Sequence, residues 1–75
     1  MYKIINNNKA QPANNGYICS LYGRKFIALF TGSEAAMHET MAAIGYKQAE
    51  ICRASDIQIK CMQSLGASTY IIKEA

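Results

Sequence analysis

Tryptophan is absent from this sequence, and proline and histidine each occur once. No apolar run approaches the ~20 residues that a membrane-spanning helix needs, since the longest covers only residues 26–30. A secretory signal is also lacking, because residues 2–5 run directly into Asn6-Asn7-Asn8 rather than into an apolar segment. The pattern argues against a membrane protein and predicts a cytoplasmic one with reduced thiols.

Metal and cofactor sites are not expected either. The three cysteines form no Cys-x-x-Cys pair and the glycines occur singly, so neither a zinc site nor a phosphate-binding loop is predicted. The best candidate for acid–base chemistry is His38, one helical turn after Glu34, with Cys52 as a candidate nucleophile. Such an i, i+4 pair is equally typical of a solvent-exposed helix face, and the sequence therefore predicts no catalytic residue and no enzyme.

The chain has 75 residues, of which 51% are hydrophobic and 17% charged, and this predicts one small domain over residues 1–75. Its net charge is +3, and the first 30 positions contain basic residues but no acidic one. An acidic protein surface or a phosphate backbone would therefore be attracted to the N-terminal part.

Strand and turn signals dominate this N-terminal part. Residues 2–5 are typical of a short strand, and the Asn-rich segment 6–16 is predicted to be a loop with nothing large to bury. Residues 17–22 and 25–30 are predicted to form a β-hairpin that is closed by a type II′ turn at Gly23-Arg24.

Two helices and two strands are predicted in the remainder. Residues 48–53 and 68–73 are strand-like, and the last strand is expected to be a sheet edge open to strand addition. Each helix has a capping box at its start and a glycine at its end. The signals are Thr31 with Glu34 and then Gly45 for the first helix, and Ser55 with Gln58 and then Gly66 for the second.

The predicted fold class is α+β: a single small two-layer domain with a mixed sheet of four to five strands and two helices. The order of elements is strand, loop, strand, strand, helix, strand, helix, strand. Helical spacing predicts which side chains face the sheet. These are Met37, Met41 and Ile44 in the first helix, and Ile57, Cys61 and Leu65 with Met62 in the second.

The hairpin has two faces, and the second is the candidate functional surface. Alternation places Ile18, Ile27 and Leu29 together on this face, bordered by Tyr22 and Lys25, a pattern typical of a protein interface. If a helix covered the face, it would be core instead, and the sequence fits both interpretations. The first face is almost purely apolar and is predicted to be core. It holds Tyr17, Cys19, Leu21, Phe26, Ala28 and Phe30.

The expected function is that of a small stand-alone, non-catalytic binding protein. It would dock on a larger protein or protein complex and modulate or inhibit it, as small inhibitors encoded by phages and other mobile elements do, anti-defence proteins among them. The predicted partner-binding residues are Ile18, Tyr22, Arg24, Lys25, Ile27 and Leu29. A homodimer through the same surface is an alternative use of it.

A second hypothesis is nucleic-acid binding at the hairpin tip. Basic side chains beside an exposed aromatic ring are what a single strand requires, and Tyr22, Arg24 and Lys25 meet that description, with Lys9 as a further cation. Tyr17 and Phe26 are predicted to point into the core, which leaves Tyr22 as the only ring free for stacking.

Overall fold

The computed structural model describes residues 2–11 and 15–74. Within these residues the elements follow the order β1 (Tyr2–Asn6), β2 (Asn15–Leu21), β3 (Arg24–Phe30), α1 (Glu34–Ala43), β4 (Glu50–Ala54), α2 (Asp56–Ser64) and β5 (Thr69–Glu74). The strands form one mixed sheet with the order β1-β5-β3-β2-β4. The β3–β5 pair is parallel and the other pairs are antiparallel, which confirms the predicted α+β class.

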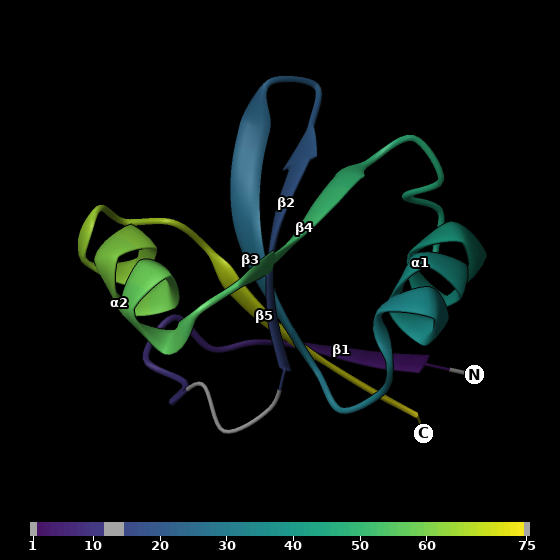
Figure 1. The fold of residues 1–75 in the computed structure, drawn as a ribbon, viewed down its shortest axis with the longest axis horizontal. Helices are drawn as coiled ribbons and strands as arrows, with labels where there is room; N and C mark the ends of the chain where they lie inside the picture. Colours follow the sequence, from purple (N-terminus) through teal and green to yellow (C-terminus); the bar gives the residue numbers. More distant parts are fainter. Residues whose placement is uncertain (1, 12–14, 75) are drawn as a thin grey trace.

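The layering differs from the prediction, because the two helices lie on opposite faces of the sheet (Figure 1). On one face, Met37 and Met41 of α1 pack as predicted against Tyr17 and other buried strand residues. On the other face, Ile59 of α2 packs against the strand residue Leu29. The domain is therefore a sheet between two helices rather than a two-layer structure. No helix in the described part of the chain is long and apolar enough to cross a membrane.

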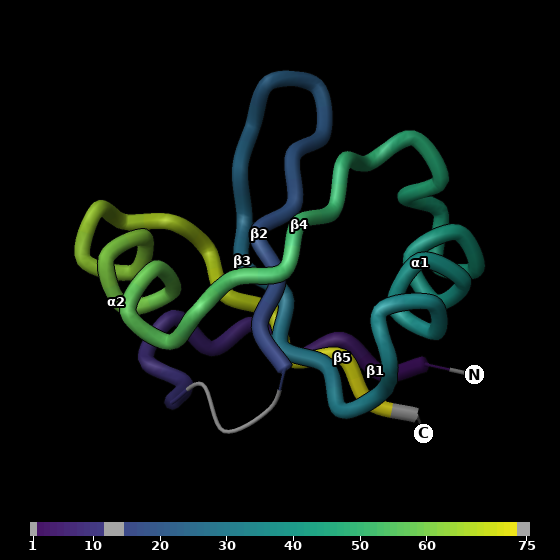
Figure 2. Tube along the Cα trace, in the orientation of Figure 1, coloured from purple at the N-terminus to yellow at the C-terminus, as the bar shows by residue number. Residues whose placement is uncertain are grey.

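The C-terminal strand is an inner strand, so its predicted role as an open edge is wrong. β5 lies between β1 and β3, and the edges of the sheet are β1 and β4. The antiparallel β1–β5 pairing brings Tyr2 opposite Glu74, so that the two ends of the described chain lie side by side (Figure 2). β1 thus covers the edge of β5 that was predicted to be exposed.

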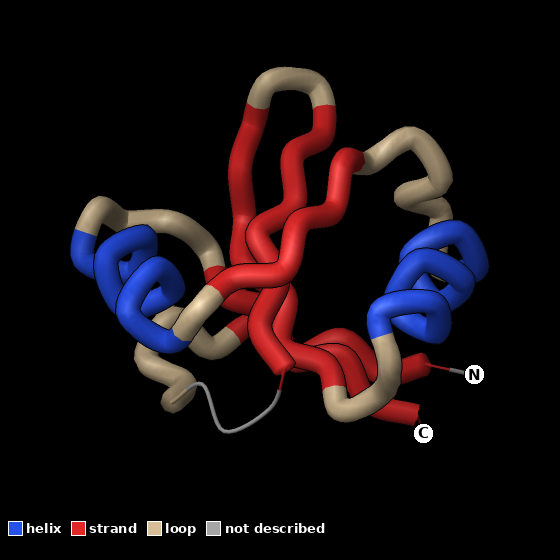
Figure 3. Tube along the Cα trace, in the orientation of Figure 1, coloured by secondary structure: helices blue, strands red, loops and turns tan. Residues whose placement is uncertain are grey.

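The β2–β3 hairpin turns at Tyr22 and Gly23 rather than at Gly23-Arg24, and it projects beyond both helices (Figure 3). Both turn residues have positive φ angles, 52° and 76°, as a type I′ turn requires. Cys19 consequently pairs with Phe26 instead of Ala28. A register shift of this even kind leaves the side chains of residues 17–21 and 25–30 on their predicted faces, because strand side chains alternate with a period of two. Tyr22, which was predicted to pair with Lys25, lies in the turn instead.

The helix ends follow the predicted signals with one exception. In the α2 capping box, the Ser55 N–H donates to Gln58 Oε1 over 2.8 Å, and the Gln58 N–H donates to Ser55 Oγ over 3.3 Å. The N-cap of α1 is Ser33 rather than Thr31, because the Ser33 hydroxyl accepts the Ala36 N–H over 3.1 Å. The glycines predicted to end the helices do so with positive φ angles of 99° at Gly45 and 90° at Gly66.

The orientation of α2 differs from the helical-stripe prediction. Ile59 is the fully buried residue of this helix, whereas Ile57 and Leu65 are 80% and 78% exposed and Cys61 is exposed as well. Ile59 lies against the β2 backbone at Gly16, where an added Cβ would overlap the Ile59 Cδ1 atom. The missing side chain at Gly16 leaves the space that Ile59 fills, and this fit sets the rotation of the helix. Of the predicted stripe, Ile57, Cys61 and Leu65 therefore face outward, whereas Met62 is partly buried against the core as predicted.

The Asn-rich loop is shorter and better anchored than predicted. Asn6 belongs to β1, Asn15 and Gly16 belong to β2, and positions 12–14 of the predicted loop lie outside the described residues. The Thr69 N–H donates to Asn8 Oδ1 over 2.9 Å, and Gln63 Nε2 donates to the Ala10 carbonyl over 2.9 Å. Ala10 itself is buried in the cluster beneath α2, so this segment contributes to the core.

Candidate functional site

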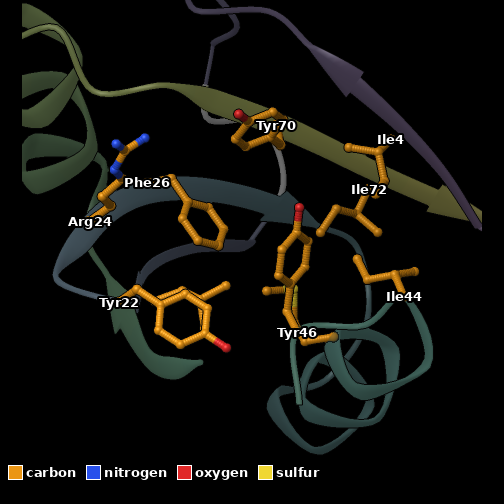
Figure 4. A pocket seen from close by; sticks show the side chains of 10 residues that line it. Ile4, Tyr22, Arg24, Phe26, Ile44, Tyr46, Tyr70 and Ile72 are labelled. Atoms are coloured by element: carbon orange, nitrogen blue, oxygen red, sulfur yellow. The ribbon is translucent and has the colours of Figure 1, made fainter. Parts of the chain in front are cut away.

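An open groove lies on the α1 face of the sheet (Figure 4). Its volume of about 640 Å³ lies within the ~300–1,000 Å³ range of ligand-binding pockets. Strands β1 and β5, the β2–β3 hairpin, α1 and the loop after α1 all contribute to it. The lining residues are Ile4, Leu21, Tyr22, Arg24, Phe26, Met41, Ile44, Tyr46, Tyr70 and Ile72.

Three aromatic rings are packed together in this groove. The Phe26 ring lies between Tyr46 and Tyr70, with ring centroids 5.9 and 5.7 Å away, and its contact with Tyr70 is edge-to-face (Figure 4). Such pairs add about 0.5–1.5 kcal/mol beyond the area that they bury, so the rings hold one another in place. Tyr46 and Ile4 nevertheless remain 38% and 44% exposed, and the groove is lined by a preformed apolar surface that solvent reaches.

Tyr22 is held at the hairpin tip in a strained conformation. A non-glycine residue with φ of 52° costs on the order of 1 kcal/mol, and asparagine or glycine would relieve this cost. The side chain is 86% exposed, so packing within the domain does not offset the free-energy cost of this backbone conformation. Strain of this kind is concentrated at functional sites, and here it presents an aromatic ring at the mouth of the groove.

One charged side chain, that of Arg24, is among the residues that line the groove. The observed turn pairs Arg24 with Leu21, which brings the guanidinium onto the groove face, where it makes no hydrogen bond or ion pair with any described residue. A neighbouring hollow between the hairpin tip and the α1–β4 loop is lined by Tyr22, Tyr46 and Lys47 among others. The two loops together therefore place cations beside exposed tyrosine rings.

Comparison with protein-family models, with curated proteins and with solved structures found no match for this chain.

The structure places the six predicted partner-binding residues in four different environments. Tyr22 and Arg24 line the groove, and Lys25 is exposed on the opposite face. Ile27 and Leu29 are 0% and 1% exposed beneath α2, so the proposed interface through them is wrong. The remaining residue, Ile18, is partly buried on the same α2 face.

Sequence reasoning missed most of the aromatic groove. Tyr46 follows the glycine that ends α1, and Tyr70 lies in the strand that was predicted to be an edge. Phe26 was assigned to the core because it shares a face with buried residues, yet it is only partly buried. The alternation of β5 places Tyr70 and Ile72 on one face, which was a signal for a shared surface. The sequence did not show which strands pair with β5.

Catalytic residues are not gathered in the described structure. His38 and Glu34 are both exposed on α1, and Cys52 lies on β4 with its side chain on the α2 face, where it pairs with Ile18. The sheet therefore separates the candidate base from the candidate nucleophile. Residues 2–11 and 15–74 also contain no group of three or more histidine, cysteine or acidic side chains that could hold a metal ion.

The three thiols differ in their environment, which leads to a first prediction. Burial, with a smaller contribution from Cys52, raises the pKa of the Cys19 thiol from 9.0 to about 12, whereas Cys52 and Cys61 are exposed. In the native protein near pH 8, a thiol reagent such as dithionitrobenzoate is expected to modify Cys52 and Cys61 rapidly and Cys19 only after unfolding. Rapid modification of all three thiols without denaturant would contradict this placement of Cys19.

Proposed function

We propose that this protein is a small non-catalytic binding protein that docks on a larger cytoplasmic protein through the aromatic groove and modulates, in the simplest case inhibits, that partner. The observation that carries the proposal is the groove itself. It is preformed, mostly apolar and open to solvent, and Arg24 lies at one end of it, which is the composition of an interface anchor site. The size of the domain is also typical of accessory inhibitors carried by phages and mobile elements.

The polar groups of the groove support binding rather than catalysis. Among the described residues that line it, Arg24 and the hydroxyls of Tyr22, Tyr46 and Tyr70 are the polar side-chain groups. A guanidinium and phenols can orient a bound partner by hydrogen bonds. General acid–base or nucleophilic catalysis would ordinarily use an imidazole, a carboxylate or an activated thiol.

The test compares one variant in the groove with a matched variant on the opposite face. The immobilised protein is incubated with host-cell lysate, and the bound proteins are identified after washes at low and at high salt. Ile4→Asp places a charge in the groove, whereas Leu65→Asp makes the same kind of change on the exposed face of α2. A specific partner should be retained by the wild-type protein and by Leu65→Asp at both salt concentrations, and lost by Ile4→Asp.

Adding the captured partner back supplies the functional readout. Its own activity is expected to change with stoichiometric wild-type protein and to stay unchanged with Ile4→Asp, while circular dichroism shows that both variants are folded. Loss of the partner by Leu65→Asp but not by Ile4→Asp would instead place the docking surface on α2. Light scattering that shows a homodimer dissociated by Ile4→Asp would assign the groove to a second copy of this chain.

Nucleic-acid binding remains a second candidate because of one observation. Tyr22 is exposed beside Arg24, and Lys25 and Lys47 lie in the segments that form the hairpin tip and the neighbouring loop. This candidate predicts capture of nucleic acid that weakens steeply as the salt concentration rises. Binding that hardly changed between low and high salt would contradict it.

A further inference from the structure

The charge distribution around the groove is one-sided. None of the ten residues that line it is aspartate or glutamate, and Arg24 is among them. Lys47 lines the neighbouring hollow at the hairpin end of the groove. The two acidic residues of α1 lie outside the lining. An anion that approaches this end therefore meets attraction without a competing carboxylate in the wall.

Arg24 is free to bind such an anion. Its side chain is exposed, lines the groove and makes no hydrogen bond or ion pair with any described residue. A guanidinium offers a planar fork of donors that matches both oxygens of a carboxylate. Figure 4 shows Arg24 at one end of the groove, on the side of Phe26 away from Ile72 and Ile4.

The remainder of the lining favours a peptide over a nucleic acid. Half of it is aliphatic, and these side chains, which include Ile4, Ile44 and Ile72, offer no ring for a base to stack on. A nucleic-acid strand also requires cations along its whole phosphate track. Lys3 and Lys73, which pair across β1 and β5, alternate with Ile4 and Ile72 and therefore face the α2 side.

We infer that the groove binds an acidic peptide segment of the partner, with an aromatic or large aliphatic side chain inserted against Phe26 and a neighbouring carboxylate paired with Arg24. The inference rests on the proposed function and specifies the chemistry of the partner at that same site. The apolar insertion supplies most of the affinity, and the ion pair at the rim supplies orientation and discrimination against basic sequences.

The experiment uses a phage-displayed library of random 12-residue peptides, selected on the wild-type protein and counter-selected on the Ile4→Asp variant. Enriched peptides are synthesised with a fluorescent label and titrated by fluorescence anisotropy. We expect them to share a large apolar residue close to aspartate or glutamate. Arg24→Gln should weaken their binding about tenfold or more, because charge-assisted hydrogen bonds are lost.

Two matched controls isolate the ion pair. Lys25→Gln removes the same charge from the adjacent residue, which faces the opposite side, and should change affinity less than about twofold. In peptides with the acidic residue replaced by its amide, Arg24→Gln should have an equally small effect, because the carboxylate is already absent.

Each other outcome overturns the inference in a distinguishable way. Groove-dependent peptides that lack acidic residues, or that bind Arg24→Gln as tightly as wild type, would refute the ion pair and leave the proposed docking function standing. Tight binding of a labelled 15-nucleotide oligothymidylate that Arg24→Gln abolishes would assign the groove to nucleic acid. If neither the library nor the lysate yields a ligand that depends on the groove, both the inference and the proposed function fail.

Discussion

Glutamate in place of Ile27 or Leu29 is expected to unfold the protein. Both side chains are essentially inaccessible, at 0% and 1% exposure, and lie between the sheet and Ile59 of α2. A domain of this length has a free energy of unfolding of about 4–11 kcal/mol. An unpaired carboxylate in an apolar core costs several kcal/mol, which is enough to abolish the native state. The measurement is far-ultraviolet circular dichroism together with thermal denaturation at neutral pH.

The pH dependence of these variants provides an internal check. Burial raises the pKa of a carboxyl group above its ordinary value of about 4.3, so the penalty is smallest below that pH and grows as pH rises towards the raised pKa. The variants should therefore recover part of their lost stability near pH 4. Leu65→Glu on the exposed face of α2 is the control, and it should change the free energy of unfolding by less than about 0.5 kcal/mol. A Leu29→Glu protein that melts like wild type would show that this face is open.

Alanine at Gly16 is expected to destabilise the protein by about 1–3 kcal/mol. Replacing a strand glycine by alanine ordinarily stabilises a protein, because glycine loses more backbone entropy on folding. Here the added Cβ would overlap Ile59 Cδ1, so Ile59 would have to leave its position between α2 and β2. Urea denaturation, followed by circular dichroism, measures the change in the free energy of unfolding.

Ile59→Val tests the physical reason for this cost. The substitution deletes the Cδ1 atom that the new Cβ would meet and by itself costs about 0.5–1.5 kcal/mol. In the double variant the two changes should compensate, so that the combined loss is smaller than the sum of the single losses. Strict additivity would mean that Ile59 does not occupy the space above Gly16.

The wrong prediction of an interface at Ile27 and Leu29 and the wrong prediction of how α2 is oriented have one cause. The hairpin faces were predicted correctly from alternation, but the choice between an interface and a core for Ile27 and Leu29 depended on where α2 packs. That position follows from a fit between Ile59 and Gly16, which are far apart in the sequence. The prediction that Ile57, Cys61 and Leu65 face the sheet was wrong for the same reason, because their regular spacing was outweighed by one close packing site.

Local sequence patterns predicted some residues of the groove but not the groove as a whole. Tyr22 and Arg24 were predicted as binding residues from their place near a turn, and both line the groove. Tyr46 and Tyr70 reach it from a loop and from a strand that are remote in sequence, through contacts with Phe26. No local pattern marks such residues as members of one site.

The sequence by itself determined the local features of this protein. Capping side chains, terminal glycines and strand alternation act over a few residues, so they predicted the α2 capping box, the C-terminal ends of both helices and the two faces of the hairpin. Only the tertiary structure decided the strand order, the placement of one helix on each face, and the groove between the hairpin tip, α1 and β5. These features depend on side-chain packing between distant segments, whose free energy is set by three-dimensional fit and not by the periodicity of any one segment.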